Sequence, residues 1–220
     1  MGDLAPSLDS SVGDFVGSGK ANNTKGEPYA ALPNGQSIRM LILEPGELAD
    51  PLKGRLEPTD IDTAGSYEAL SYVWGKSNQV DNISIRHGNN EWPVDLTASL
   101  KETLLRLRFP DKQRRLWVDQ ICINQSDVAE RSQQVQFMNR VYKHASRVLV
   151  WLGADDTGLA KPAFELVHNL DHIFQDEIKR AHFSTAATKD LEEQSRDRWN
   201  TLDHLTGCPW VSRETTTGRI

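Results

Sequence analysis

Short apolar runs, each ended by glycine, proline or a polar cluster, recur along the chain and are typical of β-strands. One pair of runs flanks His87-Gly88-Asn89-Asn90, which favours a β-hairpin. The segment from Glu44 to Gly65 is rich in proline and aspartate, and we expect it to be a connection. The predicted strands cover residues 38–43, 67–74, 114–119 and 148–152, with 82–86 and 91–94 forming the hairpin.

Helical periodicity appears between these runs. Thr97 can cap a helix that places Leu100, Leu104 and Leu107 on one face and ends at Phe109-Pro110. Asp127, with Glu130 three residues later, favours a helix start, and the apolar stripe that follows extends to about His144. Two further helices are expected at about 159–180 and 188–205. This alternation of strands and helices predicts an α/β fold, a mostly parallel sheet flanked by helices, with the hairpin as an antiparallel insertion.

The first 36 residues are rich in Gly, Ser, Asn, Asp and Pro and lack periodicity. They offer too little apolar surface to offset the entropy of ordering, so residues 1–36 are expected to be a mostly disordered tail before a domain over 37–220. Residues 17–20 (Gly-Ser-Gly-Lys) look briefly like a phosphate-binding loop. Asp14 stands where that motif needs glycine and Ala21 where it needs Ser or Thr, so the pattern is rejected.

Charge and composition narrow the possible functions. The 220 residues carry a formal net charge of -6 and no long run of Lys or Arg, which argues against nucleic-acid binding. Two cysteines exclude a disulfide scaffold and favour reduced thiols in the cytoplasm. No signal peptide is visible, and no apolar stretch approaches the 18 or so residues of a membrane span.

Polar segments follow three of the predicted strands, at 74–78, 119–125 and 153–156. Ligands bind outside the carboxyl ends of parallel strands, so we expect these three turns to share one edge and to meet around a pocket. The amides at the helix start near Asp127 would favour an anionic group there.

Structural roles compete with this hypothesis. The tryptophans at strand ends, Trp74, Trp117 and Trp151, suit a core. Asp119 and Asn124 suit turns, and Glu130 and Arg131 suit a helix cap and a solvated charge. Cys122, between two isoleucines, is expected to be a buried small hydrophobe. No metal site is expected, because the pairs formed by His168 with His172 and by His204 with Cys208 lack a third ligand. The serine-hydrolase elbow is missing from the sequence.

Several separate motifs resemble those of HET domains, the module named for heterokaryon incompatibility in filamentous fungi. Residues 67–75 (Tyr-Glu-Ala-Leu-Ser-Tyr-Val-Trp-Gly) resemble the opening motif of that family. Residues 116–125 (Leu-Trp-Val-Asp-Gln-Ile-Cys-Ile-Asn-Gln) and 130–135 (Glu-Arg-Ser-Gln-Gln-Val) resemble its central motif, and 148–153 (Val-Leu-Val-Trp-Leu-Gly) its close. A later Pro-Trp-x-x-Arg element begins at 209–213, but the aromatic and Gln-Glu stretch that follows it in the family is missing. The resemblance therefore implies a C-terminally truncated domain.

HET domains are similar, at a distance, to TIR domains, which have a flavodoxin-like sheet. Some TIR domains signal by self-association, and others cleave nicotinamide from NAD. The resemblance implies a first hypothesis, a signalling module in non-self recognition and programmed cell death that acts through protein partners or self-association.

The second hypothesis is a glycosidase acting on NAD or a related nucleotide, with NAD as substrate and no cofactor. A carboxylate can stabilise the oxocarbenium-like state of such a cleavage. Asp119 is the first choice for this carboxylate and Glu130 the second. Trp74 is expected to stack on a ring, while Asn124 and Gln125 hold ribose hydroxyls. The full set of expected ligand-binding residues is Ser71, Trp74, Gly75, Asn124, Gln125 and Arg131.

Overall fold

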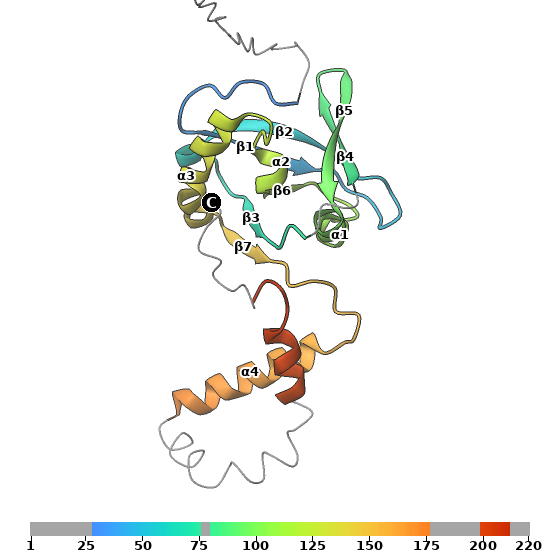
Figure 1. Cartoon of the computed structure of the whole chain (residues 1–220), viewed down its shortest axis with the longest axis vertical. Coiled ribbons are helices and arrows are strands. Elements are labelled where there is room, and N and C mark those ends of the chain that lie inside the picture. The colour runs from blue at the N-terminus through green and yellow to red at the C-terminus, as the bar shows by residue number, and fades with distance from the viewer. Residues whose placement is uncertain (1–27, 76–79, 177–198, 212–220) are drawn as a thin grey trace, which may run out of the picture.

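A seven-stranded mixed sheet forms the centre of the molecule (Figure 1). The computed structural model describes residues 28–75, 80–176 and 199–211. The strands lie in the order β5-β4-β2-β1-β6-β3-β7. Their bounds are β1 Ser37–Leu43, β2 Lys53–Asp60, β3 Glu68–Ser71, β4 Val80–His87, β5 Asn90–Thr97, β6 Arg114–Trp117 and β7 Arg147–Val150.

Parallel pairing joins β6, β3 and β7 at one side of the sheet, and it also joins β2 to β4. The hairpin of β4 and β5 is antiparallel, and β1 runs antiparallel to both β2 and β6. The predicted α/β class is confirmed, including the antiparallel hairpin. The sequence indicated antiparallel pairing only in the hairpin, whereas β1 also runs antiparallel to both of its neighbours, β2 and β6.

All seven residues of β1 are buried, since the strand has partners on both edges and packed side chains on both faces. Its apolar residues join a core that includes Tyr67, Trp117 and Ile121, each at most 2% exposed. Arg39 is buried in the same strand at 2% exposure. A charged side chain in such a strand requires a partner, which the site described below supplies.

The prediction of a plain connection from Glu44 to Gly65 was wrong. This segment contains β2 and a short 3-10 helix, η1 (Ile61–Thr63). Gly54 and Pro58 lower its strand propensity, but β2 pairs with β1 along that strand's whole length. Gly54 is required by close approach, because a Cβ there would lie 2.8 Å from the carbonyl oxygen of Ile42.

The predicted helices from Thr97 and Asp127 are confirmed. In α1 (Ala98–Leu107) the Thr97 hydroxyl accepts a hydrogen bond from the Leu100 amide, and Leu100 and Leu104 are fully buried. α2 (Asp119–Cys122) is a single turn directly after β6. α3 (Val128–His144) begins at Asp127, whose carboxylate caps the helix.

A last pair of helical segments lies beyond the β7 edge of the sheet (Figure 1). α4 (Ala160–Gln175) ends at Gln175, before the predicted end near 180. Residues 199–206 are helical, and the rest of the helix predicted at 188–205 lies outside the described residues. Within the described ranges, no helix is long and apolar enough to cross a membrane.

Part of the predicted N-terminal tail contacts the domain. Tyr29 packs against the core and beneath the Arg39 guanidinium, and the Ala30 carbonyl accepts a hydrogen bond from Arg39. The Gly35 carbonyl accepts one from Gln133 of α3. Residues 28–36 are therefore held by the sheet and α3, whereas residues 1–27 lie outside the described part of the chain.

Candidate functional site

The carboxyl ends of β6, β3 and β7 lie at one edge of the sheet, because the three neighbouring strands are parallel. The turns after β6 and β3 meet there. The Trp74 indole donates a hydrogen bond to Asp119 Oδ2 over 3.0 Å, which joins residues far apart in the sequence. This contact fulfils the sequence-based expectation for two of the three turns.

The third turn, after β7, does not join them. Leu152 to Asp155 line a separate cavity of about 70 Å³ with residues of the 199–206 helix and Cys208. The Asp155 carboxylate accepts a hydrogen bond from the Ala160 amide, which fixes the turn to the start of α4. The expected three-turn pocket was wrong in this respect, because the chain turns from β7 towards α4 and away from the β3 and β6 ends (Figure 1).

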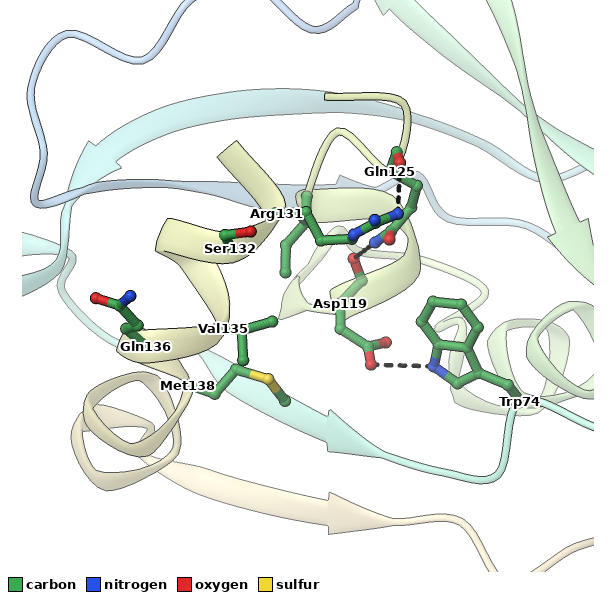
Figure 2. A pocket seen from close by; sticks show the side chains of 9 residues that line it. Trp74, Asp119, Gln125, Arg131, Ser132, Val135, Gln136 and Met138 are labelled. Atoms are coloured by element: carbon green, nitrogen blue, oxygen red, sulfur yellow. Dashed lines mark hydrogen bonds between the residues drawn. The ribbon is translucent and has the colours of Figure 1, made fainter. Parts of the chain in front are cut away.

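A cavity of about 600 Å³, here called the first hollow, lies between the end of β3, the turn of α2 and one face of α3 (Figure 2). Its volume is within the range of small-molecule sites in proteins. The lining combines apolar side chains with one carboxylate, one guanidinium, two side-chain amides and one hydroxyl. The lining residues are Trp74, Asp119, Ile123, Gln125, Arg131, Ser132, Val135, Gln136 and Met138.

Asp119 is the carboxylate of the first hollow. It opens α2 immediately after the buried strand β6, and its side chain is only partly buried. Oδ1 accepts a hydrogen bond from the Gln120 amide at 2.7 Å, while Oδ2 accepts the one from Trp74. Burial raises the pKa of the neighbouring Tyr72 phenol, and the negative charge of Asp119 raises it further. The phenol is therefore neutral at physiological pH, so the carboxylate has two neutral aromatic neighbours.

Trp74 forms a wall of the cavity and is not a core residue, since it is 40% exposed. The expected core role is confirmed for Trp117, which is fully buried, and for Trp151, which packs against the core. Gly75 follows with a φ of 72°, a left-handed conformation that favours glycine in this turn. Ser71, the last residue of β3, accepts a hydrogen bond from the Trp210 indole at 3.0 Å and does not line either large cavity.

The loop between α2 and α3 and the start of α3 bring three of the expected ligand-binding residues together. Asn124 forms the predicted Asx-turn, its Oδ1 accepting the Ser126 amide at 3.2 Å. The Gln125 side chain donates to the Asp119 carbonyl at 2.9 Å, and the Arg131 guanidinium donates to the Gln125 carbonyl at 3.1 Å. These bonds fix Gln125 and Arg131 at the upper rim of the first hollow (Figure 2).

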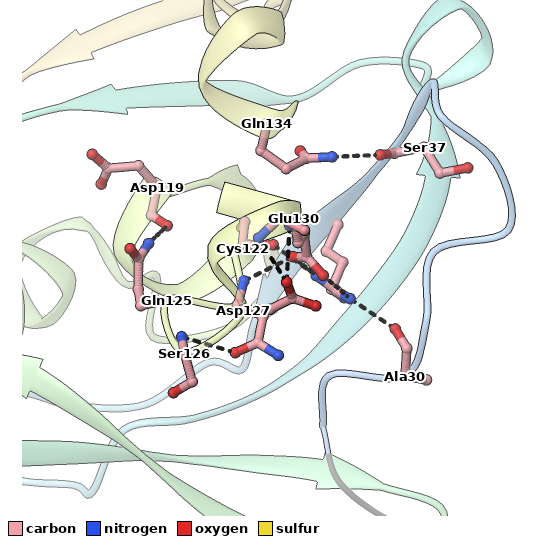
Figure 3. A network of polar contacts seen from close by, with 12 residues as sticks. Ala30, Ser37, Asp119, Cys122, Gln125, Ser126, Asp127, Glu130 and Gln134 are labelled. Atoms are coloured by element: carbon pink, nitrogen blue, oxygen red, sulfur yellow. Dashed lines mark hydrogen bonds and ion pairs between the residues drawn. The ribbon is translucent and has the colours of Figure 1, made fainter. Parts of the chain in front are cut away.

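Glu130, the second expected carboxylate, is held elsewhere. It forms an ion pair with Arg39 through two contacts of 2.5 and 3.0 Å, and it accepts the Asn124 amide at 2.8 Å (Figure 3). Its side chain is only 12% exposed, and it lines neither large cavity. The structure therefore brings Asp119 to the cavity and leaves Glu130 out of it.

The expectation of free amides at the start of α3 was wrong for two of them. The Asp127 carboxylate accepts the amides of Ala129 and Glu130 at 2.9 and 3.0 Å. A helix cap from the chain itself thus takes the place that an anionic ligand would need. Arg131, which is exposed, is the cation that lines the first hollow.

Cys122 is a core residue, as expected. It is 1% exposed, and burial raises the pKa of its thiol to about 12. His168 and His172 face each other on α4 with their Nε2 atoms 3.1 Å apart. In the part of the chain that the structure describes, no group of three or more His, Cys, Asp or Glu side chains could hold a metal ion.

Two features of the site escaped the sequence analysis. Arg39 had a visible signal, a lone arginine in the apolar run 38–43 that required a buried partner. A second hollow, of about 490 Å³, adjoins the first and shares Trp74 and Gln125 with it. It also takes residues from β5, and nothing in the sequence indicated that this hairpin strand reaches the α2–α3 loop.

Comparison with known proteins agrees with this arrangement of motifs. The family described as Heterokaryon incompatibility protein (HET) matches residues 67–216, which include every lining residue of the first hollow. A relative from Neurospora crassa, "Heterokaryon incompatibility protein 6, OR allele", is 41% identical over 126 residues, which cover 53% of this chain and 18% of that protein. No solved structure matches. The family match extends over more than half of the sequence, and the chain belongs to the HET family of heterokaryon incompatibility proteins.

Proposed function

We propose that the chain acts in the cytoplasm as a signalling module of heterokaryon incompatibility, in which non-self recognition leads to programmed cell death. The family match over residues 67–216 carries this proposal, together with the name of the Neurospora crassa relative. The chain corresponds to less than a fifth of that relative, so the activity of the whole relative extends to this chain only as a proposal.

The outer edge of the sheet supports a role in docking. Among the described residues, β7 is the last strand of the sheet, with β3 as its neighbour, and Val148 and Val150 on it are 44% and 42% exposed. Unpaired backbone groups on an edge strand favour pairing with another chain. Phe164 of α4, beyond this edge, is also exposed, at 53%. These features suit self-association or binding of a protein partner.

The test combines an association assay with a cell-death assay. Size-exclusion chromatography with light scattering of the full chain is expected to show complexes that Val148→Lys with Val150→Lys reduces. The same double variant, expressed in a filamentous fungus, is expected to lose the killing that the natural chain causes. Val128→Lys is the control, because Val128 is 64% exposed at the start of α3. A strictly monomeric chain, or full killing by the double variant, would contradict signalling through this edge.

A second function, a glycosidase acting on NAD or a related nucleotide, is supported by the position of Asp119 in the first hollow beside Trp74. In this reaction the bond between ribose C1′ and the nicotinamide nitrogen breaks, and its electron pair neutralises the pyridinium. The Asp119 carboxylate stabilises the resulting oxocarbenium-like ribose. Water then bonds to C1′ and loses a proton, giving ADP-ribose and nicotinamide. Trp74 stacks on the ring, and Gln125 and Asn124 hold ribose hydroxyls.

Incubation of the pure chain with NAD, followed by chromatography of nicotinamide, tests this second function. Asp119→Asn is expected to lower the cleavage rate by at least about a hundredfold, since it removes the charge that stabilises the transition state. Asp111→Asn, an exposed aspartate in the turn before β6, serves as the control. Absence of nicotinamide release by the natural chain would remove this function. Full activity of Asp119→Asn would remove the role of Asp119 alone.

A further inference from the structure

The second hollow has a different character from the first. It lies between the edge strand β5, the loop after α2 and the segment that precedes β1, and it meets the first hollow at Trp74 and Gln125. Its volume of about 490 Å³ suits part of a small molecule. The lining residues are Pro28, Tyr29, Trp74, Trp92, Pro93, Val94, Asp95, Gln120, Asn124, Gln125 and Ser126.

Aromatic side chains from three separate segments dominate these walls. Tyr29 comes from the segment before β1, Trp74 from the turn after β3 and Trp92 from β5. Pro28 and Pro93 add further apolar surface. Aromatic faces favour a flat ring, which can stack on them whatever its substituents.

Side-chain amides provide the polar part of the same hollow, and each is already oriented by a bond to the protein. Gln120 Oε1 accepts hydrogen bonds from Tyr72 and Thr97, Asn124 Oδ1 accepts the Ser126 amide, and Gln125 Nε2 donates to the Asp119 carbonyl. Within residues 28–75, 80–176 and 199–211, the opposite ends of these amides, two NH₂ groups and one carbonyl, form no hydrogen bond and can meet a ligand. An adenine ring offers ring-nitrogen acceptors to an NH₂ donor such as that of Gln120, while Asn124 and Gln125 hold the adjoining ribose hydroxyls.

Trp92 contributes its ring, and not its N–H group, to the second hollow. Its Nε1 is shielded from solvent and has no hydrogen-bond partner in the described part of the chain. A buried N–H group without a partner is uncommon in folded proteins. Because water cannot reach this Nε1, a larger ligand cannot either, and Trp92 meets a bound base only through its ring.

The two hollows differ in the charged side chains that line them, and this difference indicates where each part of a ligand that spans both hollows would lie. The second hollow is lined by one charged side chain, the carboxylate of Asp95, and by no Lys or Arg, which suits a neutral base and not a phosphate. Arg131 lies on the first hollow, bonded to the carbonyl of Gln125 where the two hollows meet. Base, phosphate and ribosyl bond would then lie in sequence at Trp92, Arg131 and Asp119.

We propose that the second hollow binds the adenine ring of an adenine nucleotide. The inference deepens the proposed glycosidase function and rests on it for the claim that one dinucleotide spans both hollows. Adenine binding itself requires no cleavage, so a test with AMP separates the two.

Titration calorimetry of the full chain with AMP is the first measurement. Trp92→Leu keeps an apolar side chain and removes the flat ring, so AMP affinity is expected to fall about tenfold, as for other base–aromatic stacks. Trp199→Leu is the matched control, because it makes the same substitution at a tryptophan that is 37% exposed and lies in the helical segment beyond β7. Its AMP affinity is expected to stay within about twofold, the range of a surface substitution.

Saturation-transfer NMR on the natural chain keeps the proposal testable if Trp92→Leu does not fold. The adenine protons of AMP are expected to receive more saturation than the ribose protons, and nicotinamide is expected not to displace AMP. Failure of AMP to bind at millimolar concentration, or displacement of AMP by nicotinamide, overturns the inference. NAD cleavage without AMP binding would leave the glycosidase function standing and remove this inference, whereas AMP binding without NAD cleavage would do the reverse.

Discussion

Asp119 and Glu130 make an instructive comparison, since both carboxylates lie in the same motif-rich segment and both were candidates for catalysis. Glu130 is enclosed, with Arg39 on both of its oxygens and the Asn124 amide as a further donor. Asp119 faces a cavity and shares one of its oxygens with the Trp74 indole. The same residue class thus serves the fold in one place and a prospective ligand in the other.

The difference lies in what each carboxylate neutralises. Glu130 balances Arg39, which is 2% exposed and would otherwise be a buried charge without an opposite charge nearby. The pair also holds the loop before α3, because Arg39 donates to the Cys122 carbonyl and Glu130 accepts from Asn124. We call this set of contacts the Arg39–Glu130 clamp. The clamp orders the loop, and the loop in turn carries Gln125 to the cavity.

The largest expected effect on stability is that of Glu130→Ala, which leaves Arg39 buried without a counter-charge. The free energy of unfolding is expected to fall by about 3–5 kcal/mol. Urea unfolding measures the loss. Glu57→Ala is the control, because its ion pair with Arg55 is partly exposed to solvent and contributes about 1 kcal/mol or less. Equal losses in the two variants would show that the clamp does not stabilise the fold.

Burial in the core also protects the Cys122 thiol from reagents in solution. Burial raises the pKa of its thiol from 9.0 to about 12, so at pH 9 the folded chain holds about five-hundredfold less of this thiolate than the unfolded chain. Because the pKa of this thiol is higher in the folded chain, the neutral thiol contributes fully to the free energy of unfolding below about pH 9. This contribution is lost as the pH rises towards 12. Alkylation at pH 9, read by peptide mass spectrometry, is expected at the partly exposed Cys208 in the folded chain and at Cys122 only in urea. Rapid labelling of Cys122 in the native chain would contradict this.

In the turn after β3, Gly75→Ala is expected to lower the free energy of unfolding by about 1–2 kcal/mol. The φ of 72° puts a Cβ in the left-handed region, although space itself is not limiting, since the nearest atom is Ser99 Cβ at 3.7 Å. Thermal unfolding measures the cost. Gly35→Ala, which has no positive φ and meets only the end of the Gln133 side chain, is expected to change stability by less than about 0.5 kcal/mol. A neutral Gly75→Ala would mean that the turn adapts.

Asp119→Asn is expected to have the smallest effect on stability, about 1 kcal/mol, because the amide keeps one acceptor oxygen and loses one of the two hydrogen bonds from the Trp74 indole and the Gln120 backbone N–H. Urea unfolding beside the NAD assay separates a residue that serves a ligand from one that serves the fold. If Asp119→Asn destabilises the chain as much as Glu130→Ala, the distinction between the two carboxylates fails.

Local patterns predicted the parts of the fold that depend on neighbours in sequence. The cap at Asp127, the stripe of α1 and the buried strand of β6 were all predicted, because capping and periodicity act over a few residues. β2 was missed because its glycine and proline argue against a strand locally, and only pairing with β1 overrides them.

The sequence alone determined the HET motifs, the strand ends that carry them and the residues available for chemistry. Only the tertiary structure decided which of these residues share a cavity. It paired Glu130 with Arg39 across 91 positions, seated Asp119 beside Trp74 and turned the segment after β7 away from both. The physical reason is that burial, counter-charge and strand order are set by contacts between distant segments, which local sequence patterns do not encode.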